Sequence, residues 1–142
     1  MPRWPAQNDY RRGRTCVFRL QAHLVFVTKR RRGVLTDRAL VMMEGVMGEV
    51  CKAADAKLVK FNGEDDHVHL LVDYPPKLSL SELVNRLKGL SSRILRRDLP
   101  QLANRRSLRW HLWSPSWIGV SCGGAPLETI KAYIDGQRRP TS

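Results

Sequence analysis

Apolar and polar positions alternate over residues 14–28. Leu24 and Phe26 fall on one face of this segment, and His23 falls on the other. A period of two is that of a β-strand, so the pattern predicts a long strand with one apolar and one mixed face. A basic turn, residues 29–33, follows it.

Two later segments show the three- and four-residue spacing of an amphipathic helix. Thr36 is a candidate N-cap for a helix that reaches about residue 56. Ser79, followed three residues later by Glu82, forms a capping-box pattern that predicts the start of a second helix. The apolar stripes consist of Leu40, Met43, Met47, Val50 and Ala54 in the first helix, and of Leu80, Leu83, Leu87, Leu90 and Ile94 in the second.

Three further segments predict strands. Residues 57–61 and 66–74 are short and β-prone, and Asn62-Gly63 predicts the start of a tight connection that lets them pair. Residues 108–121 are aromatic and β-prone but contain a proline, which favours a bent or edge strand.

The predicted order is therefore strand, helix, strand, strand, helix, strand. It is typical of an α+β protein with the ferredoxin-like (split βαβ) fold, in which an antiparallel sheet carries two helices on one face and leaves the other open to a ligand. After a Gly-Gly hinge at 123–124, Pro126 predicts a last helix to about residue 138. Residues 1–13 carry two prolines and three arginines and predict a flexible basic arm, whereas residues 14–142 predict one domain.

The charge of the chain indicates the class of its partner. The 142 residues include 25 Lys+Arg against 13 Asp+Glu, for a formal net charge of +12. Such an excess favours a polyanion, with nucleic acid ahead of a membrane surface. Three widely spaced cysteines without a C-x-x-C pair argue against a disulfide framework or a cysteine zinc site. Because no apolar run reaches the roughly 18 residues of a membrane span, we expect a cytoplasmic protein.

The most informative motif is the run from Asp66 to His69. Strand alternation places Val68 on the side of the helices, and His67 and His69 together on the opposite side. Their Cα atoms should lie roughly 6.5–7 Å apart, so both imidazoles can reach one metal ion. The same pair also fits two surface histidines, or a hydrogen-bonded pair without a metal.

A second candidate pair is Tyr133 and Gln137, which share one side of the last predicted helix because they are four residues apart. Tyrosine can act as a covalent nucleophile. Its phenol has a pKa of about 10, so a nearby cation or base must assist it at neutral pH. A glutamine carbonyl is a neutral oxygen ligand. The tyrosine also fits a packing role at an interface.

Basic and aromatic side chains supply candidate contacts to nucleic acid. Cations would contact backbone phosphates, and tryptophans would stack on extruded bases. The candidates for phosphate contact are Lys29, Arg30, Arg86, Lys88, Arg93, Arg97, Arg105 and Arg106, and those for stacking are Trp110, Trp113 and Trp117.

Four motifs in this order resemble the single-tyrosine HUH transposases (TnpA type) of the smallest bacterial and archaeal insertion sequences. They are HLVFVTKRR with His23, DHVHLL with His67 and His69, LWSPSW, and YIDGQ at the last predicted helix. The resemblance spans about residues 14–138.

The resemblance implies a transposase that cleaves and rejoins single-stranded DNA at element ends through a 5′-phosphotyrosine. Tyr133 would correspond to the nucleophile, and His67, His69 and Gln137 to the metal ligands. Mg²⁺ or Mn²⁺ is the family expectation, although imidazoles equally accept zinc. The partners implied are DNA hairpins and a second copy of the chain. In such homodimers the tyrosine helix can complete the partner subunit's site, and the hinge at 123–124 is placed to allow that.

Two other interpretations fit the sequence. One is a domesticated relative that processes repetitive extragenic palindromes. The other is a non-catalytic ferredoxin-like module that binds nucleic acid, which the charge and the tryptophans alone would favour.

Overall fold

The computed structural model describes residues 11–13, 17–99, 111–121 and 134–136. Its elements are β1 (Arg11–Arg12), β2 (Val17–Phe18), β3 (Gln21–Val27), the 3-10 turn η1 (Lys29–Arg31), α1 (Asp37–Ala53), β4 (Lys57–Gly63), β5 (His67–Asp73), α2 (Leu80–Asp98) and β6 (Ile118–Ser121).

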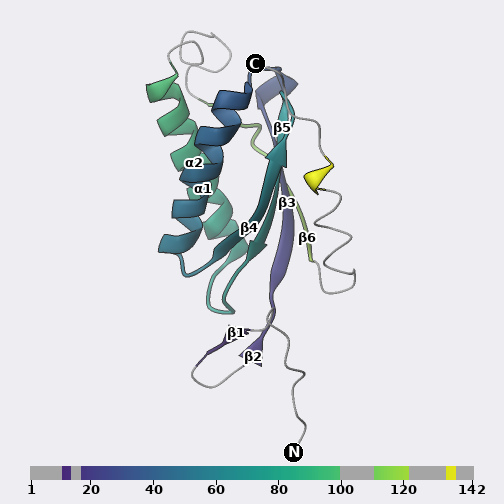
Figure 1. Cartoon of the computed structure of the whole chain (residues 1–142), viewed down its shortest axis with the longest axis vertical. Helices are drawn as coiled ribbons and strands as arrows, with labels where there is room; N and C mark the ends of the chain where they lie inside the picture. The colour runs from purple at the N-terminus through teal and green to yellow at the C-terminus, as the bar shows by residue number, and fades with distance from the viewer. Residues whose placement is uncertain (1–10, 14–16, 100–110, 122–133, 137–142) are drawn as a thin grey trace, which may run out of the picture.

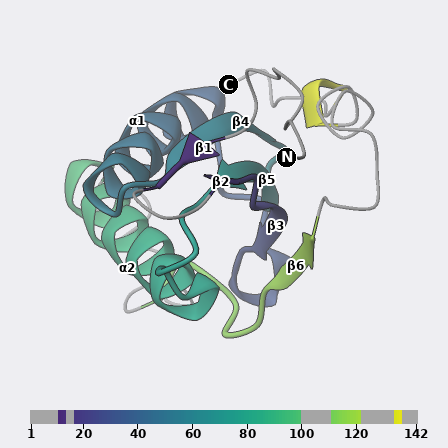
Figure 2. The same cartoon turned by 90° about the horizontal axis from the view of Figure 1, so that it is seen from below.

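Four strands form one antiparallel sheet in the order β4-β5-β3-β6. Both long helices pack on one face of this sheet (Figure 1). The α+β class, the order of the elements and the shared face of the two helices are therefore as predicted. The edge strand predicted over 108–121 is shorter in the described residues, where β6 forms only its last four residues. The last predicted helix lies mostly outside the described residues. Its described part, 134–136, lies on the far side of the sheet from α1 and α2 (Figures 1 and 2).

The core forms where the apolar faces of sheet and helices meet. Alternate residues of β3 and β5, among them Leu24, Phe26 and Leu70, are fully buried in one cluster with Met43 and Leu87 of the helices. Each such side chain contributes roughly 1.5–3 kcal/mol through burial. The alternation predicted for both strands is confirmed, and it fixes which side chains face away from the helices.

Both predicted helix caps are present. The Thr36 hydroxyl accepts a hydrogen bond from the Ala39 amide at 3.1 Å, and the Ser79 hydroxyl accepts one from the Glu82 amide at 3.4 Å. Each satisfies an amide that the first helical turn leaves without a partner. None of the helices in the described residues is long and apolar enough to cross a membrane.

The N-terminal part differs from the single long strand that the alternation predicts. In the described residues, β2 and β3 are separate strands, and β2 pairs with β1. Arg11 of β1, within the predicted arm, reaches Asp73 at 3.2 Å and Asp55 at 3.3 Å. These ion pairs hold β1 against the end of β5.

The predicted connection between β4 and β5 starts two residues too early, because Asn62 and Gly63 both belong to β4 and Glu64 to Asp66 make the turn. Gly63 is paired with Val68, and a Cβ at Gly63 would lie 2.5 Å from the His67 carbonyl oxygen. Glycine is therefore required by the close approach of two backbones and not by a turn conformation.

We expect Gly63→Ala to lower the free energy of unfolding by about 1–3 kcal/mol, the usual cost of overpacking. Gly45→Ala is the matched control, because its Cβ would meet no atom within 4 Å, and we expect it to be neutral or stabilising. Urea unfolding measures both. Equal stability of the two variants would contradict this account of Gly63.

Candidate active site

The two histidines of the central motif lie side by side on β5, an inner strand of the sheet. His67 is in register with Val27, and His69 with Val25 and with Asn62. The imidazole centroids are 5.0 Å apart, with ring planes at 83°. His69 is only 5% exposed, and His67 is half-buried. The alternation of β5 places both on the face away from α1 and α2, as predicted.

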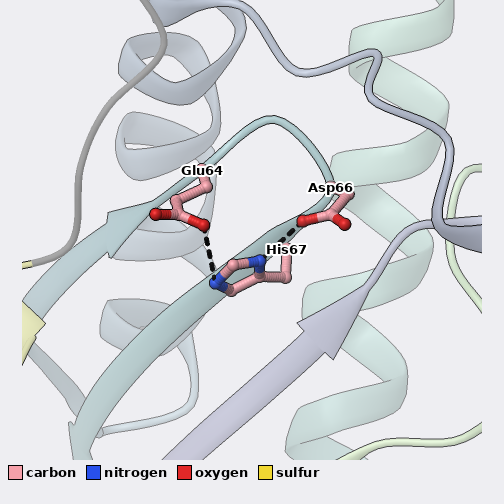
Figure 3. Close-up of side chains that lie close together, drawn as sticks. All are labelled: Glu64, Asp66 and His67. Atoms are coloured by element: carbon pink, nitrogen blue, oxygen red, sulfur yellow. Dashed lines mark hydrogen bonds and ion pairs between the residues drawn. The ribbon is translucent and has the colours of Figure 1, made fainter.

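Two carboxylates flank the His67 ring (Figure 3). Asp66 Oδ1 lies 2.7 Å from His67 Nδ1, and Glu64 Oε2 lies 3.8 Å from His67 Nε2. The first distance is that of a strong hydrogen bond, and the second is too long for one. A spacing of 3.8 Å is instead within the span of two metal–ligand bonds of about 2 Å each.

A third histidine, His23 of β3, contacts the second ring of the pair. His23 Nε2 lies 3.0 Å from His69 Nδ1, and the ring centroids are 5.2 Å apart. Because His69 is in register with Val25, the two histidines are diagonal neighbours across the strands. Burial lowers the pKa of His23 below its usual value, which favours the neutral ring.

The same face also carries an apolar contact. Leu71 of β5 and Ile134 are fully buried against each other, with Val59 packed beside them. The Asn62 amide donates to the Ile134 carbonyl at 3.2 Å, and Lys60 pairs with Asp135 at 3.1 Å. The expectation that this face is open is therefore wrong around Leu71, because residues 134–136 cover it.

The donor atoms here suit a divalent cation. Glu64, Asp66 and His67 each offer a ligand atom, and these atoms all lie within 4.8 Å of one another. Carboxylate oxygens suit Mg²⁺ and Mn²⁺, and imidazole nitrogens also accept zinc, so the donor types alone do not select one metal. This cluster shares His67 with the predicted ligand set. Gln137, like Tyr133, lies outside the described residues, although both flank the described segment 134–136 in sequence.

Sequence reasoning assigned no role to Glu64, Asp66 or His23. The alternation of β3 could have indicated a role for His23, because it places this side chain on the same face as the histidine pair. Its contact with His69 depends on the register of β3 against β5, which periodicity does not give. Glu64 falls within the predicted connection, as it does in the structure, but no motif there marks it as a ligand.

The predicted phosphate contacts lie in separate parts of the fold. Lys29 and Arg30 belong to η1, which is tied to the histidine motif because the Thr28 amide donates to the Asp66 carbonyl at 2.9 Å. By contrast, Arg86 and Arg93 are exposed on α2, on the helical side, and line a cavity of about 560 Å³ with residues of α1.

Three other predicted contacts differ in their surroundings. Arg97 is exposed and pairs with Asp98 at 2.7 Å. Lys88 donates to the carbonyl oxygens of Ser114 at 2.6 Å and Ser116 at 3.2 Å, so it holds the segment before β6. Burial lowers the pKa of Lys88. Arg105 and Arg106 lie outside the described residues.

Trp113 is not available for base stacking, contrary to the sequence prediction. It is 6% exposed, lies edge-on to Phe26 with centroids 5.7 Å apart, and donates from its indole nitrogen to Ser91 at 3.0 Å. Trp117 is partly buried against the same core. Trp110 lies outside the described residues.

The fold and the site together define a class of small α+β proteins in which a histidine pair lies on the sheet face opposite two helices. Residues 16–137 match the family model described as "Transposase IS200 like". The chain belongs to this family of transposases, whose members process DNA enzymatically.

Individual relatives agree with this family. The chain is similar to the ISDra2 transposase TnpA of Deinococcus radiodurans, with 27% identity over 91% of each chain. It is also similar to the transposase for insertion sequence element IS200 of Salmonella typhimurium, with 30% identity over 81% of this chain and 74% of the relative.

Solved structures agree as well. A crystal structure of a transposase candidate from Deinococcus radiodurans superposes with a TM-score of 0.73 and 28% identity, over 91% of this chain and 98% of that one. A REP-associated tyrosine transposase bound to a REP hairpin superposes with a TM-score of 0.58 over 95% of this chain and 69% of that one. At 12% identity, the latter shows a shared fold alone.

Proposed function

We propose that this chain is a DNA transposase that cleaves and rejoins single-stranded DNA at insertion-sequence ends through a 5′-phosphotyrosine at Tyr133. One observation supports it above the others. His67 and His69 lie on the sheet face that Ile134 covers, and Ile134 is the neighbour of Tyr133 in the sequence. The described segment that follows the proposed nucleophile therefore contacts the face of the histidine pair. We propose that Tyr133 acts at the histidine pair of its own subunit, or of the partner's when the segment is exchanged.

The chemistry of Tyr133 is an exchange of one phosphodiester for another. Its hydroxyl loses a proton and bonds to the scissile phosphorus, while the bond from phosphorus to the 3′ oxygen breaks and that oxygen takes up a proton. The products are a 5′-phosphotyrosine and a free 3′-hydroxyl. Because the number of phosphodiester bonds is conserved, a second 3′-hydroxyl reverses the step on a new strand without ATP.

His67, His69 and Gln137 are the proposed ligands of a divalent ion, Mg²⁺ or Mn²⁺, and the position of Glu64 adds a carboxylate to that set. When bound, the ion supplies Lewis-acid polarisation of a non-bridging phosphate oxygen. The chain orients the scissile phosphate through these ligands and through the exposed cations of η1.

A transposase assay tests this proposal. The protein is incubated with single-stranded and double-stranded versions of the element ends, with and without Mn²⁺. We expect a covalent protein–DNA complex only with single strands and metal. If the protein binds DNA in a salt-sensitive way, the binding is unchanged by a chelator and no cleavage occurs, the chain is the non-catalytic module instead. Cleavage of repetitive palindromes in preference to element ends would indicate a domesticated relative.

The proposal includes a homodimer, and β6 supports it. Ile118 and Val120 are 58% and 55% exposed, and they stand opposite Val25 and His23, so they share the face of the histidine pair. An edge strand with exposed apolar side chains is a ready surface for a second copy.

We expect the double change Ile118→Lys and Val120→Lys to weaken dimerisation at least tenfold, because each buried side chain of this size contributes roughly 1.5–3 kcal/mol. Val41→Lys is the matched control, since Val41 is 57% exposed but lies on α1. Sedimentation velocity over a dilution series measures the dissociation constant. An unchanged dimer in the double variant would exclude this surface.

A further inference from the structure

Both histidines of the pair have their Nδ1 atoms engaged by groups of this chain. His67 Nδ1 lies 2.7 Å from Asp66 Oδ1, and His69 Nδ1 lies 3.0 Å from His23 Nε2. An ionised carboxylate only accepts hydrogen bonds, so Asp66 keeps a proton on Nδ1 of His67. In the neutral ring, the lone pair then resides on Nε2, the atom that faces Glu64.

The contact between His23 and His69 has two possible directions, because each neutral ring has one donor and one acceptor nitrogen. If His69 accepts at Nδ1, its proton is on Nε2 and the ring has no lone pair left for a metal. If His69 donates from Nδ1, its ring lone pair is on Nε2. Only the second direction makes both histidines ligands through the same nitrogen.

We infer that Asp66 and His23 are positioning residues that fix His67 and His69 in the Nδ1–H tautomer, so that both present Nε2 to the metal. For His69 the inference rests on the proposed function, because metal ligation selects the direction of its hydrogen bond. For His67 it rests on the carboxylate alone. Outer-shell hydrogen bonds of this kind set the tautomer and the orientation of metal-binding histidines.

Each positioning residue is itself held in place. Thr28 is fully buried, and its amide donates to the Asp66 carbonyl at 2.9 Å. The second carboxylate oxygen of Asp66 faces Arg31 Nε at 3.5 Å. The basic turn η1 is thereby linked to the His67 ring. His23 lies within β3, in register with Leu71 on one side and Val120 on the other.

Nitrogen-15 NMR of the histidine rings in the metal-free, full-length protein tests the tautomers directly. We expect His67 and His69 both to carry the proton on Nδ1. In Asp66→Ala and in His23→Ala, the neighbouring ring should become a mixture of tautomers. An Nε2–H tautomer at either His67 or His69 in the unchanged protein would overturn the inference.

Conservative variants separate positioning from a general loss of structure. Asp66→Asn keeps an acceptor oxygen near Nδ1 of His67, and His23→Gln places a carbonyl oxygen close to the former Nε2. We expect both to retain the Nδ1–H tautomer. Mixed tautomers in these two variants, alongside unchanged thermal unfolding, would count against the inference.

The affinity for Mn²⁺ without DNA, measured by electron paramagnetic resonance, gives a second readout. We expect the two alanine variants to bind about tenfold or more weakly, and the Asn and Gln variants to stay close to the unchanged protein. Alanine variants that bind as tightly as the unchanged protein would overturn the positioning role. Nδ1–H tautomers in a protein that binds no Mn²⁺ would uphold the assignment at His67 and overturn the proposed metal site.

Discussion

Tyr133→Phe is expected to abolish the covalent protein–DNA complex, with a loss of about 10³-fold or more, while binding of single-stranded DNA persists. Phenylalanine keeps the ring and removes only the hydroxyl that bonds to phosphorus. Losses of this order follow removal of a covalent nucleophile. Denaturing gels of labelled oligonucleotide count the complex, and fluorescence anisotropy measures binding.

Tyr74→Phe is the control for this experiment. Tyr74 packs against the core between the sheet and the helices. Its hydroxyl therefore takes no part in the proposed reaction. We expect the Tyr74 variant to form the complex at the normal rate. A complex that is undiminished in Tyr133→Phe would reject the assignment of the nucleophile.

His67→Ala is expected to slow cleavage by about 10²–10³-fold and to weaken Mn²⁺ binding, without a matching loss of DNA binding. Metal ions contribute several kcal/mol to the stabilisation of a phosphoryl transition state, and each 1.36 kcal/mol corresponds to about tenfold in rate. His67 is the better choice for this test, because His69 is more deeply buried and its removal would also leave His23 without that partner.

The control for His67 is His111→Ala. His111 is exposed in the segment that follows α2 and lines a cavity with Ser92 and Arg96 of α2, and we expect the variant to cleave at the normal rate. Single-turnover cleavage over a Mn²⁺ titration separates a loss of metal affinity from a loss of rate. Normal cleavage by His67→Ala, or cleavage that persists in excess chelator, would contradict the proposed role of the pair.

The parts of the fold that depend on local periodicity could be predicted from the sequence. Alternation in β5 places Val68 in the core and both histidines on the other face, because one register of a strand buries one set of side chains. The caps at Thr36 and Ser79 could be predicted for the same reason, since a cap depends on residues three positions apart.

The parts that depend on tertiary pairing could not be predicted. Asn62 and Gly63 have turn chemistry, but pairing with β5 extends β4 through them. In the sequence, Trp113 is a candidate for base stacking. In the structure it lies in the core, where Ser91 of α2 accepts a hydrogen bond from its indole N–H. All three rings of the site stand in motifs of the sequence, but the contact between His23 and His69 requires the β3–β5 register and is seen only in the structure.

Identification of the residue that carries the DNA tests the central claim most directly. The covalent complex is digested with nuclease and trypsin, and the peptides are sequenced by mass spectrometry. Trypsin cuts after Lys131 and Arg138, so the proposal predicts a 5′-nucleotide on the peptide of residues 132–138, attached to Tyr133. A nucleotide on any other residue, or a cleaved strand with no protein attached at any stage of the reaction, would contradict it.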